Sequence, residues 1–312
     1  AAMLAATFTS QAVEVATSNS VSREAWAPAV WPAPRLDEKG NLLPVCSYSE
    51  LLERTLRYLL DLDTRMAAGN TIQDETGRTR HPYLFYSVSE KGKLPASGHG
   101  LANYPGHHAM FIISFLNGYV YSGNPDLLAR AEELAEWNIA HSTPPDWVYG
   151  GMIYSSIHNG KLGGFVDKDS IQPDKSAIMA ASYLRLYRMT EKPSYLKAAR
   201  QIAATLVKTQ RAEGNWHFRV NPKTGEVREE YTSTAIYAIQ LFEQLDAMQN
   251  AHEFEGPKKK ALGWLLNGPV QDMVWKGFFE DIGANPENRI NWDAIDTAGW
   301  LISNGAAISF TD

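Results

Sequence analysis

An internal repeat without gaps is the feature that most restricts how this chain can fold. The stretch from His107, HHAMFIISFLNGYVYSGNPDLLARAEELAEWNIAHS, aligns residue for residue with the stretch from Lys175, KSAIMAASYLRLYRMTEKPSYLKAARQIAATLVKTQ. In each copy a proline stands 18 positions after the first residue, at Pro125 and at Pro193. Proline suits the first turn of a helix because its φ is already helical and its missing N–H is not needed there. Each copy therefore predicts two helices joined by a short turn.

Weaker copies extend the repeat on both sides. A third copy begins near Tyr231 with YTSTAIYAIQLFEQLDAMQ, and its second helix follows Pro257. A fourth first-type helix begins near Trp292 with WDAIDTAGWLISNG. Upstream, the segment YSELLERTLRYLLDLDTRM from Tyr48 has the charged, amphipathic pattern of a second-type helix.

The two helix types predict an inner and an outer layer. First-type helices such as AIMAASYLRLY are apolar on nearly every face, which indicates burial on most sides, whereas second-type helices such as YLKAARQIAATLVK keep a polar stripe. Hairpins of about 60 residues with this alternation predict an all-α fold, an α/α toroid, in preference to an open solenoid with its shorter repeats. We expect an N-terminal extension over residues 1–46 and the toroid over residues 47–312.

The predicted ring contains fewer pairs than a closed toroid, which usually has six or seven. We count four inner helices, and LAATFTSQAVEVATSN near the N-terminus is a candidate for another. Either the ring is incomplete or the chain is cut short. The chain ends just after an inner helix, which favours truncation at the C-terminus.

Charge and cysteine content exclude several classes of function. The net charge is −6, and the only basic run, Lys258 to Lys260, has the pattern of a solvated helix face, so nucleic acid is not an expected partner. Cys46 is the single cysteine, which excludes an internal disulfide and cysteine-rich zinc sites. No apolar run approaches the ~20 residues of a membrane span. The chain begins at Ala1 without an initiator Met, which suggests a secreted or periplasmic protein whose signal peptide has been removed.

Long connections rich in aromatic residues are expected at one rim. They span about Arg80–Gly106, Trp147–Asp174, Glu213–Glu230 and Trp275–Asn291. Long connections in a compact domain are usually functional or disordered, and the aromatic content argues against disorder. The segment WHFRVNPKTGEVREEY also predicts a β-hairpin, and FFEDIGANPENRINW predicts a weaker one. Because flat aromatic rings match the C–H faces of sugars, the rim predicts a carbohydrate cleft; a small second core beneath the loops is the structural alternative.

Polar residues at the starts of the inner helices are the first site candidates. To within a residue or two, the repeat aligns His108 with Ser176, Tyr231 and Asp293. Helix N-termini favour anions, which suits the carboxylate of a uronic acid. We expect Asn103, Tyr104 and one of His107 and His108 to line the opening of the ring at the end where the long connections emerge. The other histidine is expected to cap or brace the helix. Asp174 and Asp293 are equally well placed to be N-caps.

The chain resembles α/α-toroid carbohydrate enzymes that act on uronate-containing glycans. The phrases SYLRLYRMTEKPSYLKAARQIAATLVKTQ and GNWHFRVNPKTGEVREEYTSTAI carry the resemblance, which covers residues 105–310 in repeat style. That group includes polysaccharide lyases and unsaturated glucuronyl hydrolases. The motifs do not single out one family, and they transfer no catalytic residue.

Two chemistries compete within this resemblance. A lyase removes the C5 proton of a uronate and expels the C4 substituent, using His or Tyr for proton transfer and Asn, Arg or His to neutralise the carboxylate. The lyase is the favoured interpretation, with catalytic candidates Tyr231, His107, His108, Asn103 and Arg80. Substrate-binding candidates are Tyr104, His81, Trp216, His217, Arg219, Lys175, Tyr149 and Trp275. A hydrolase would use carboxylates instead, and its acid/base candidates are Asp174, Asp293 and Glu230.

Other functions remain open from the sequence. A uronate C5-epimerase would need nearly the same groups as the lyase. A non-catalytic glycan-binding helical-repeat protein would use aromatic residues and Arg, without an essential Tyr or His. We expect an anionic poly- or oligosaccharide as the partner. No motif predicts a cofactor, and loop carboxylates leave a Ca²⁺ ion open.

Overall fold

The fold is an array of helix hairpins in two layers. The computed structural model describes residues 37–41, 48–60, 102–103, 105–155, 157–158, 161–162, 170–275 and 292–304. The inner helices are α3 (Pro105–Ser122), α5 (Pro173–Thr190), α7 (Ala235–Gln249) and α9 (Trp292–Ser303). The outer helices are α1 (Tyr48–Leu60), α4 (Pro125–Ala140), α6 (Pro193–Thr209) and α8 (Glu255–Leu265). The predicted first-type and second-type helices are therefore the inner and outer layers.

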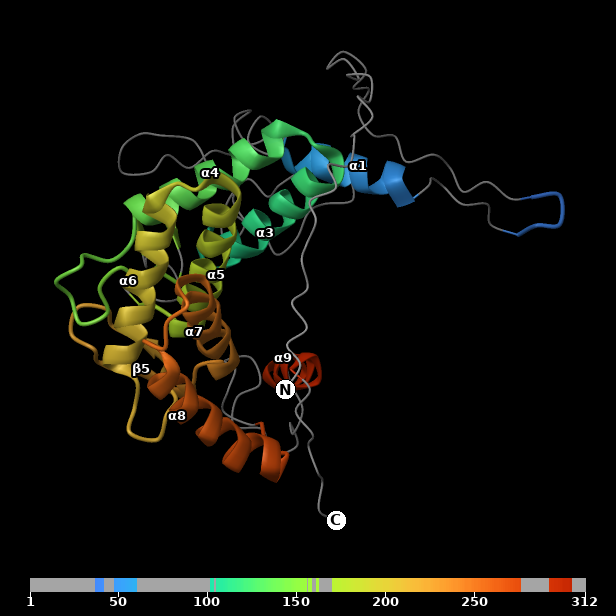
Figure 1. Cartoon of the computed structure of the whole chain (residues 1–312). Helices are drawn as coiled ribbons and strands as arrows, with labels where there is room; N and C mark the ends of the chain where they lie inside the picture. Colours follow the sequence, from blue (N-terminus) through green and yellow to red (C-terminus); the bar gives the residue numbers. More distant parts are fainter. Residues whose placement is uncertain are drawn as a thin grey trace, which may run out of the picture.

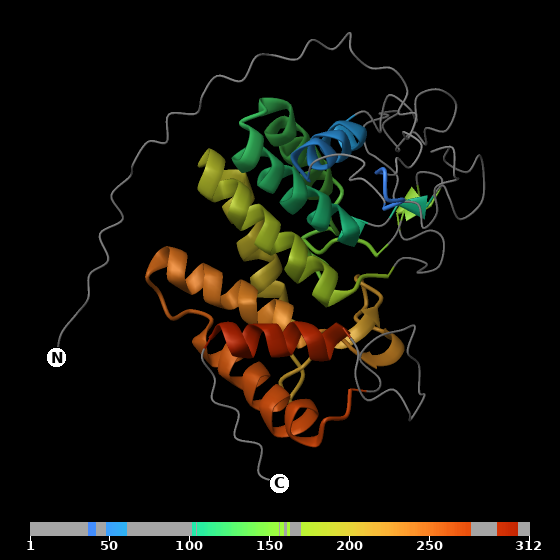
Figure 2. The same ribbon diagram turned by 90° about the vertical axis from the view of Figure 1, so that its right-hand side faces the viewer.

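The inner helices follow one another side by side. Helix α3 packs against α5, α5 against α7, and α7 against α9, while each of the first three also packs against the outer helix that follows it. Figure 2 shows the four inner helices as a series that runs from α3 through α5 and α7 to α9. The expected α/α-toroid architecture is confirmed. The expected N-terminal extension lies largely outside the described residues.

Short turns join the members of the first two hairpins, as the repeat predicts. Between α3 and α4, Gly123 has a positive φ of 67°, and the side chain of Asn124 accepts the backbone N–H of Asp126 at 3.0 Å, which caps α4. Between α5 and α6, Glu191 adopts the left-handed conformation. Pro125 and Pro193 occupy first-turn positions of the outer helices.

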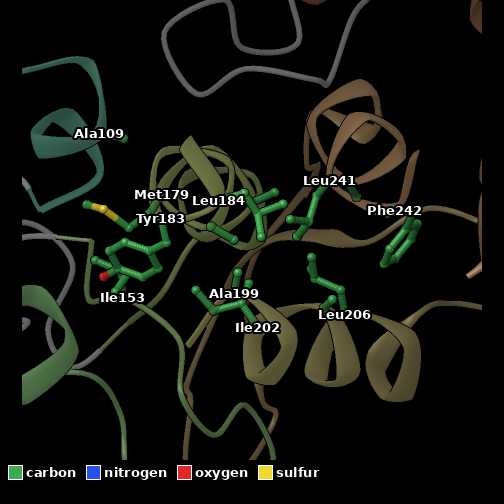
Figure 3. Close-up of a cluster of buried hydrophobic side chains, with 14 of the residues drawn as sticks. Ala109, Ile153, Met179, Tyr183, Leu184, Ala199, Ile202, Leu206, Leu241 and Phe242 are labelled. Carbon is green, nitrogen blue, oxygen red and sulfur yellow. The ribbon is translucent and has the colours of Figure 1, made fainter. Parts of the chain in front are cut away.

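The main core lies between the two layers. Inner-helix residues Met179, Tyr183 and Leu241 meet the outer-helix residues Ile202 and Leu206, and all five are buried (Figure 3). Helix α5 is buried on most of its length, as its apolar sequence predicts. Helix α3 differs, because Met110, Val120 and Tyr121 are exposed.

Short strands occur at the ends where the long connections emerge. Strands β4 (His217–Val220) and β5 (Val227–Thr232) form the hairpin that WHFRVNPKTGEVREEY predicts, and β5 leads directly into α7 (Figure 1). Its turn is closed by Asn221, whose side chain accepts the N–H groups of Lys223 and Thr224. The second predicted hairpin, in FFEDIGANPENRINW, lies outside the described residues.

A small antiparallel sheet joins two of the long connections. Strand β1 (Ala102–Asn103) pairs with β2 (Ile157–His158), which pairs with β3 (Lys161–Leu162). The segment before α3 and the segment before α5 therefore meet at one end of the array. Further along the chain, between α7 and α9, α8 continues into a π-helical turn over Leu266–Val270 that contains Pro269. Among the described helices, none is both long and apolar enough to cross a membrane.

Candidate active site

Three inner helices bring polar residues together at their N-terminal ends. Asp174 lies in the first turn of α5, Ser233 and Thr234 directly precede α7, and Asp293 lies in the first turn of α9. Each of these four residues is buried. Because buried polar groups are normally hydrogen-bonded, the partners of each one show what it does in the fold.

Asp174 ties α5 to α7. Its backbone N–H donates to Ser233 Oγ at 2.9 Å, and its Oδ2 accepts the backbone N–H of Thr234 at 3.3 Å. Its Oδ1 accepts the N–H of Lys175 at 2.7 Å. The expectation that Asp174 is the N-cap of its own helix is wrong, because Gln172 holds that position. Asp174 instead accepts an N–H at the start of the neighbouring helix, so its carboxylate is rigidly placed.

Asp293 has the opposite environment. Its exposed fraction is 2%, and neither carboxylate oxygen has a hydrogen-bond partner of normal geometry among the described residues. The expected N-cap role is therefore not observed. Burial raises the pKa of Asp293 to about 7; Thr234 and Lys175 oppose this rise in pKa, and the charges of Asp174 and Asp296 add to it. A carboxyl group with this pKa can hold or release a proton at neutral pH.

Tyr237 connects the two helices α7 and α9. It lies in the first turn of α7, and its hydroxyl donates to Asp296 Oδ2. Burial raises the pKa of Tyr237, and the hydrogen bond and negative charge of Asp296, followed by the charges of Asp174 and Asp293, raise it further. The phenol therefore stays a proton donor and lies close enough to sense all three carboxyl groups.

We call Asp174, Asp293, Asp296 and Tyr237 the carboxylate site. The two carboxyl oxygens of Asp293 lack a donor of normal geometry among the described residues, so hydroxyl groups of a ligand or water can satisfy them. A carboxyl group with a pKa near the working pH is suited to general acid–base catalysis. No cluster of three or more His, Cys, Asp or Glu side chains within the described parts of the chain is arranged to hold a metal ion.

The structure gives His108 a structural place. It is fully buried, and its Nδ1 lies 2.9 Å from Asn138 Nδ2 on the outer helix α4. Its ring also meets Trp137 edge-on at 5.9 Å between centroids. His108 therefore braces α3 against α4, which is the role expected for one of the two histidines, and its catalytic assignment stays a prediction.

Two candidates from β4 and its approach are also structural. Trp216 is 1% exposed, and its Nε1 donates to the carbonyl of Leu206 at 2.8 Å, so it is a core residue. Arg219 is buried in an ion pair with Glu229 and lies over the ring of Phe218. Both side chains are buried in these contacts, and their assignments as substrate-binding residues stay predictions.

Tyr149 and Trp275 belong to the hydrophobic core as well. Burial raises the pKa of Tyr149. Tyr231 lies in β5, half-buried, with its ring edge-on to Phe218 at 6.2 Å, and Glu230 beside it is exposed. No interaction recorded for the described residues joins either of them to the carboxylate site.

His217 and Lys175 keep part of their surface exposed. Burial, and then the positive charge of Arg211, lower the pKa of His217, whose Nδ1 has no hydrogen-bond partner among the described residues. Lys175 stands next to Asp174, and its charge lowers the pKa of Asp293. Among the substrate-binding candidates whose side chains the structure describes, Lys175 is thus the one that acts on the carboxylate site.

The remaining candidates lie beyond the described side chains. Arg80, His81 and Tyr104 fall outside the described residues, and Asn103 and His107 are described only as members of β1 and α3. Their assignments stay predictions. The sequence did not predict Tyr237 as a site residue. A signal for it exists, because Tyr237 stands two residues after the start of α7, and Lys175, a predicted site residue, stands two residues after the start of α5.

Comparison with known proteins defines the fold but not the family. No protein-family model and no curated protein matches the sequence. Cellobiose 2-epimerase from Spirochaeta thermophila is similar with a TM-score of 0.53 and 13% identity, over 81% of this chain and 74% of that one. A D-mannose isomerase is similar with a TM-score of 0.52 and 15% identity, over 79% of this chain and 63% of that one.

A third solved structure, a possible member of the GH105 family from Klebsiella pneumoniae, has a TM-score of 0.52 and 11% identity. The match covers 76% of this chain and 58% of that one. The chain thus spans less than two thirds of the second and third proteins. These α/α-toroid proteins share the helical architecture with this chain, and identities this low show the fold alone.

Proposed function

We propose that the protein is a carbohydrate-active enzyme that hydrolyses glycosidic bonds with the carboxylate site. The observation that carries this proposal is Asp293, a nearly fully buried carboxyl group without a hydrogen-bond partner of normal geometry among the described residues and with a pKa of about 7. Structural roles for a carboxylate normally involve caps or ion pairs, and Asp293 has neither within the described residues. A buried acceptor that the fold leaves unsatisfied costs stability and is expected where function requires it.

The residues divide the work of hydrolysis as follows. Asp293, which is partly protonated near neutral pH, donates its proton to the glycosidic oxygen as the C–O bond to the anomeric carbon breaks. Asp174, held by two backbone N–H groups, accepts a proton from the water whose oxygen bonds to that carbon. One carboxyl group gives a proton and the other takes one, so the reaction consumes only water.

The contacts favour this chemistry over β-elimination. The lyase expected from the sequence would use Tyr231, His107 and His108 for proton transfer. His108 is occupied in the core, and Arg219, a candidate for neutralising a uronate, is paired with Glu229. The groups that do converge are carboxylates, which is the composition expected of a hydrolase site.

The substrate class proposed is an oligosaccharide that contains a uronic acid. The sequence resemblance motivates this choice, and Lys175 supplies a positive charge next to the carboxylate site. The names of the similar proteins, a sugar epimerase and a sugar isomerase among them, support a sugar as the ligand. Their activities motivate the choice of alternatives in the test.

The test is incubation of the full chain with unsaturated glucuronyl disaccharides, saturated glucuronides, polyuronates and neutral gluco- and manno-oligosaccharides. Hydrolysis produces new reducing ends, and it consumes the ultraviolet absorbance of an unsaturated substrate. Asp293→Asn and Asp174→Asn should remove the activity, while Asp126→Asn, an exposed first-turn aspartate of α4, should keep it.

Other outcomes reject the proposal. New ultraviolet absorbance from a polyuronate would indicate elimination. A change in the configuration of a sugar without new reducing ends would indicate an epimerase or isomerase. Binding of a glycan without any turnover would indicate a non-catalytic protein.

A further inference from the structure

The half-buried Asp296 has one feature that the proposed hydrolysis does not use. Its carboxylate accepts the hydroxyl of Tyr237, which comes from the neighbouring helix α7. Asp296 follows Asp293 by three residues, and residues three apart lie on the same face of a helix. The Tyr237 hydroxyl thus binds a second carboxylate on the helical face that carries Asp293.

We propose that Tyr237 is a positioning residue: its hydroxyl holds the Asp296 carboxylate on the helical face that carries Asp293, which fixes a negative charge near the Asp293 carboxyl group. Asp296 is only partly buried, and without this hydrogen bond its charge could turn toward water. A fixed negative charge close to a buried carboxyl group disfavours ionisation of that group. The proposal rests on the carboxylate site described above and adds one contact that contributes to its protonation, beside the larger effects of burial and Asp174.

Several groups face Asp293 and have to be weighed together. Asp174 and Asp296 favour the protonated form of Asp293, whereas Lys175 and the hydrogen bond of Thr234 favour the ionised form. Asp174 is fixed by backbone donors. The hydroxyl of Tyr237 is the described side-chain donor that binds Asp296, so it is the group whose removal frees that charge. The charged or polar groups around Asp293 are Asp174 and Lys175 on α5, Thr234 and Tyr237 at the start of α7, and Asp296 on α9.

The experiment measures the protonation of Asp293 without any substrate. The unfolding free energy of the full chain is measured across pH with and without Asp293→Asn. Asp293→Asn increases the unfolding free energy, and this increase grows as pH rises and levels off above the pKa of Asp293 in the folded state. The pH at which it levels off therefore reports that pKa directly.

Three backgrounds are compared. In the parent protein this increase should level off near neutral pH. In Tyr237→Phe it should level off about one pH unit lower, because the charge of Asp296 is no longer fixed nearby. Asp296→Asn should produce a similar shift, and the double variant should shift no further than either single variant, because both remove the same interaction.

A matched control is Tyr187→Phe, which removes a phenol hydroxyl from the inner helix α5 near its C-terminal end. It should leave the levelling-off pH unchanged. The proposal is overturned if Tyr237→Phe gives the parent value while Asp296→Asn lowers it, or if neither variant changes it. Should Tyr237→Phe fail to fold, Asp296→Asn alone decides, because an unchanged value then removes the charge on which the proposal depends.

Failure of this proposal and failure of the proposed hydrolysis are separate results. The stability measurement requires no turnover, so a shifted levelling-off pH supports the positioning role even if no glycan is hydrolysed. If hydrolysis is found, the pH profile of kcat/KM in Tyr237→Phe should shift on the limb that requires protonated Asp293, in the same direction as the stability curve.

Discussion

His108 and Asp293 align in the repeat to within a residue or two, yet the fold treats them differently. Both side chains are buried at the start of an inner helix. His108 has a hydrogen-bond partner in Asn138 and an aromatic neighbour in Trp137. Asp293 has no hydrogen-bond partner of normal geometry among the described residues, and Thr234 at the start of α7 lowers its pKa. The difference teaches that position within a repeat predicts burial, whereas the partner on the neighbouring helix decides between a structural and a functional role.

Removal of the two side chains should separate these roles most strongly in turnover. Asp293→Asn should lower kcat/KM for glycoside hydrolysis about 10³-fold, within the range for the loss of a general acid. His108→Gln should stay within about threefold once the folded fraction is taken into account. Steady-state kinetics on the best substrate, with circular dichroism to verify folding, makes the comparison. Equal losses in both variants would contradict the division.

The same pair should differ in the direction of the stability change. The pKa of Asp293 is about 7 in the folded protein and 3.8 in its ordinary state. An acid whose folded pKa is raised contributes no penalty below its unfolded pKa, and the penalty grows until pH passes the folded pKa. Asp293→Asn should therefore be nearly neutral below pH ~4 and should stabilise the protein by on the order of 2–4 kcal/mol above pH ~8.

Urea unfolding at several pH values measures this effect. Asp126→Asn is the matched control, because Asp126 is exposed and should show no comparable pH dependence. A constant difference between Asp293→Asn and the parent at all pH values would mean that Asp293 titrates normally and is not a neutral-pH acid.

Truncation of the His108 contact should cost stability instead. His108→Ala removes a fully buried ring and one partner of Asn138, so the free energy of unfolding should fall by about 2 kcal/mol. Asn138→Ala should cost a similar amount. The double variant should cost less than the two single variants together, because the shared contact is lost only once. Additive losses in denaturant unfolding would show that the two residues act independently.

The sequence predicts the layers of this fold better than its site, for a physical reason. The hairpins are predicted by local signals: the apolar periodicity marks each helix, and Pro125 and Pro193 mark where the outer helices begin. Whether a buried carboxyl group has a partner depends on side chains from helices about 60 residues away. Asp174 shows this, because it was predicted to cap its own helix and instead binds the start of α7.

The third repeat copy was also misregistered. Its start was placed near Tyr231, but the chain stays in β5 through Thr232, and α7 begins at Ala235. A polar strand that runs into an apolar helix leaves no clear boundary, since TSTA lacks the proline that marks α3 and α5. Tyr237 rather than Tyr231 therefore has the first-turn position that Lys175 has in α5.

The smallest expected effect follows from this register. The sequence predicted Tyr231 as a catalytic residue, while the structure places it on a strand against Phe218, away from any described contact with the carboxylate site. Tyr231→Phe should change kcat/KM by less than about threefold and leave its pH profile in place. Tyr237→Phe removes the same hydroxyl from the α7 phenol that binds Asp296, and it should move the profile.

The paired phenol deletions compare the two registers directly in one assay. A large loss of kcat/KM in Tyr231→Phe, with kcat/KM unchanged in Tyr237→Phe, would support the alignment that starts the third repeat copy near Tyr231. It would also support the lyase residues that were chosen from that alignment. The opposite pattern would place the functional tyrosine in the first turn of α7. The hydroxyl of Tyr237 reaches the Asp296 carboxylate on α9, whereas Tyr231 on the preceding strand makes no described contact with that carboxylate.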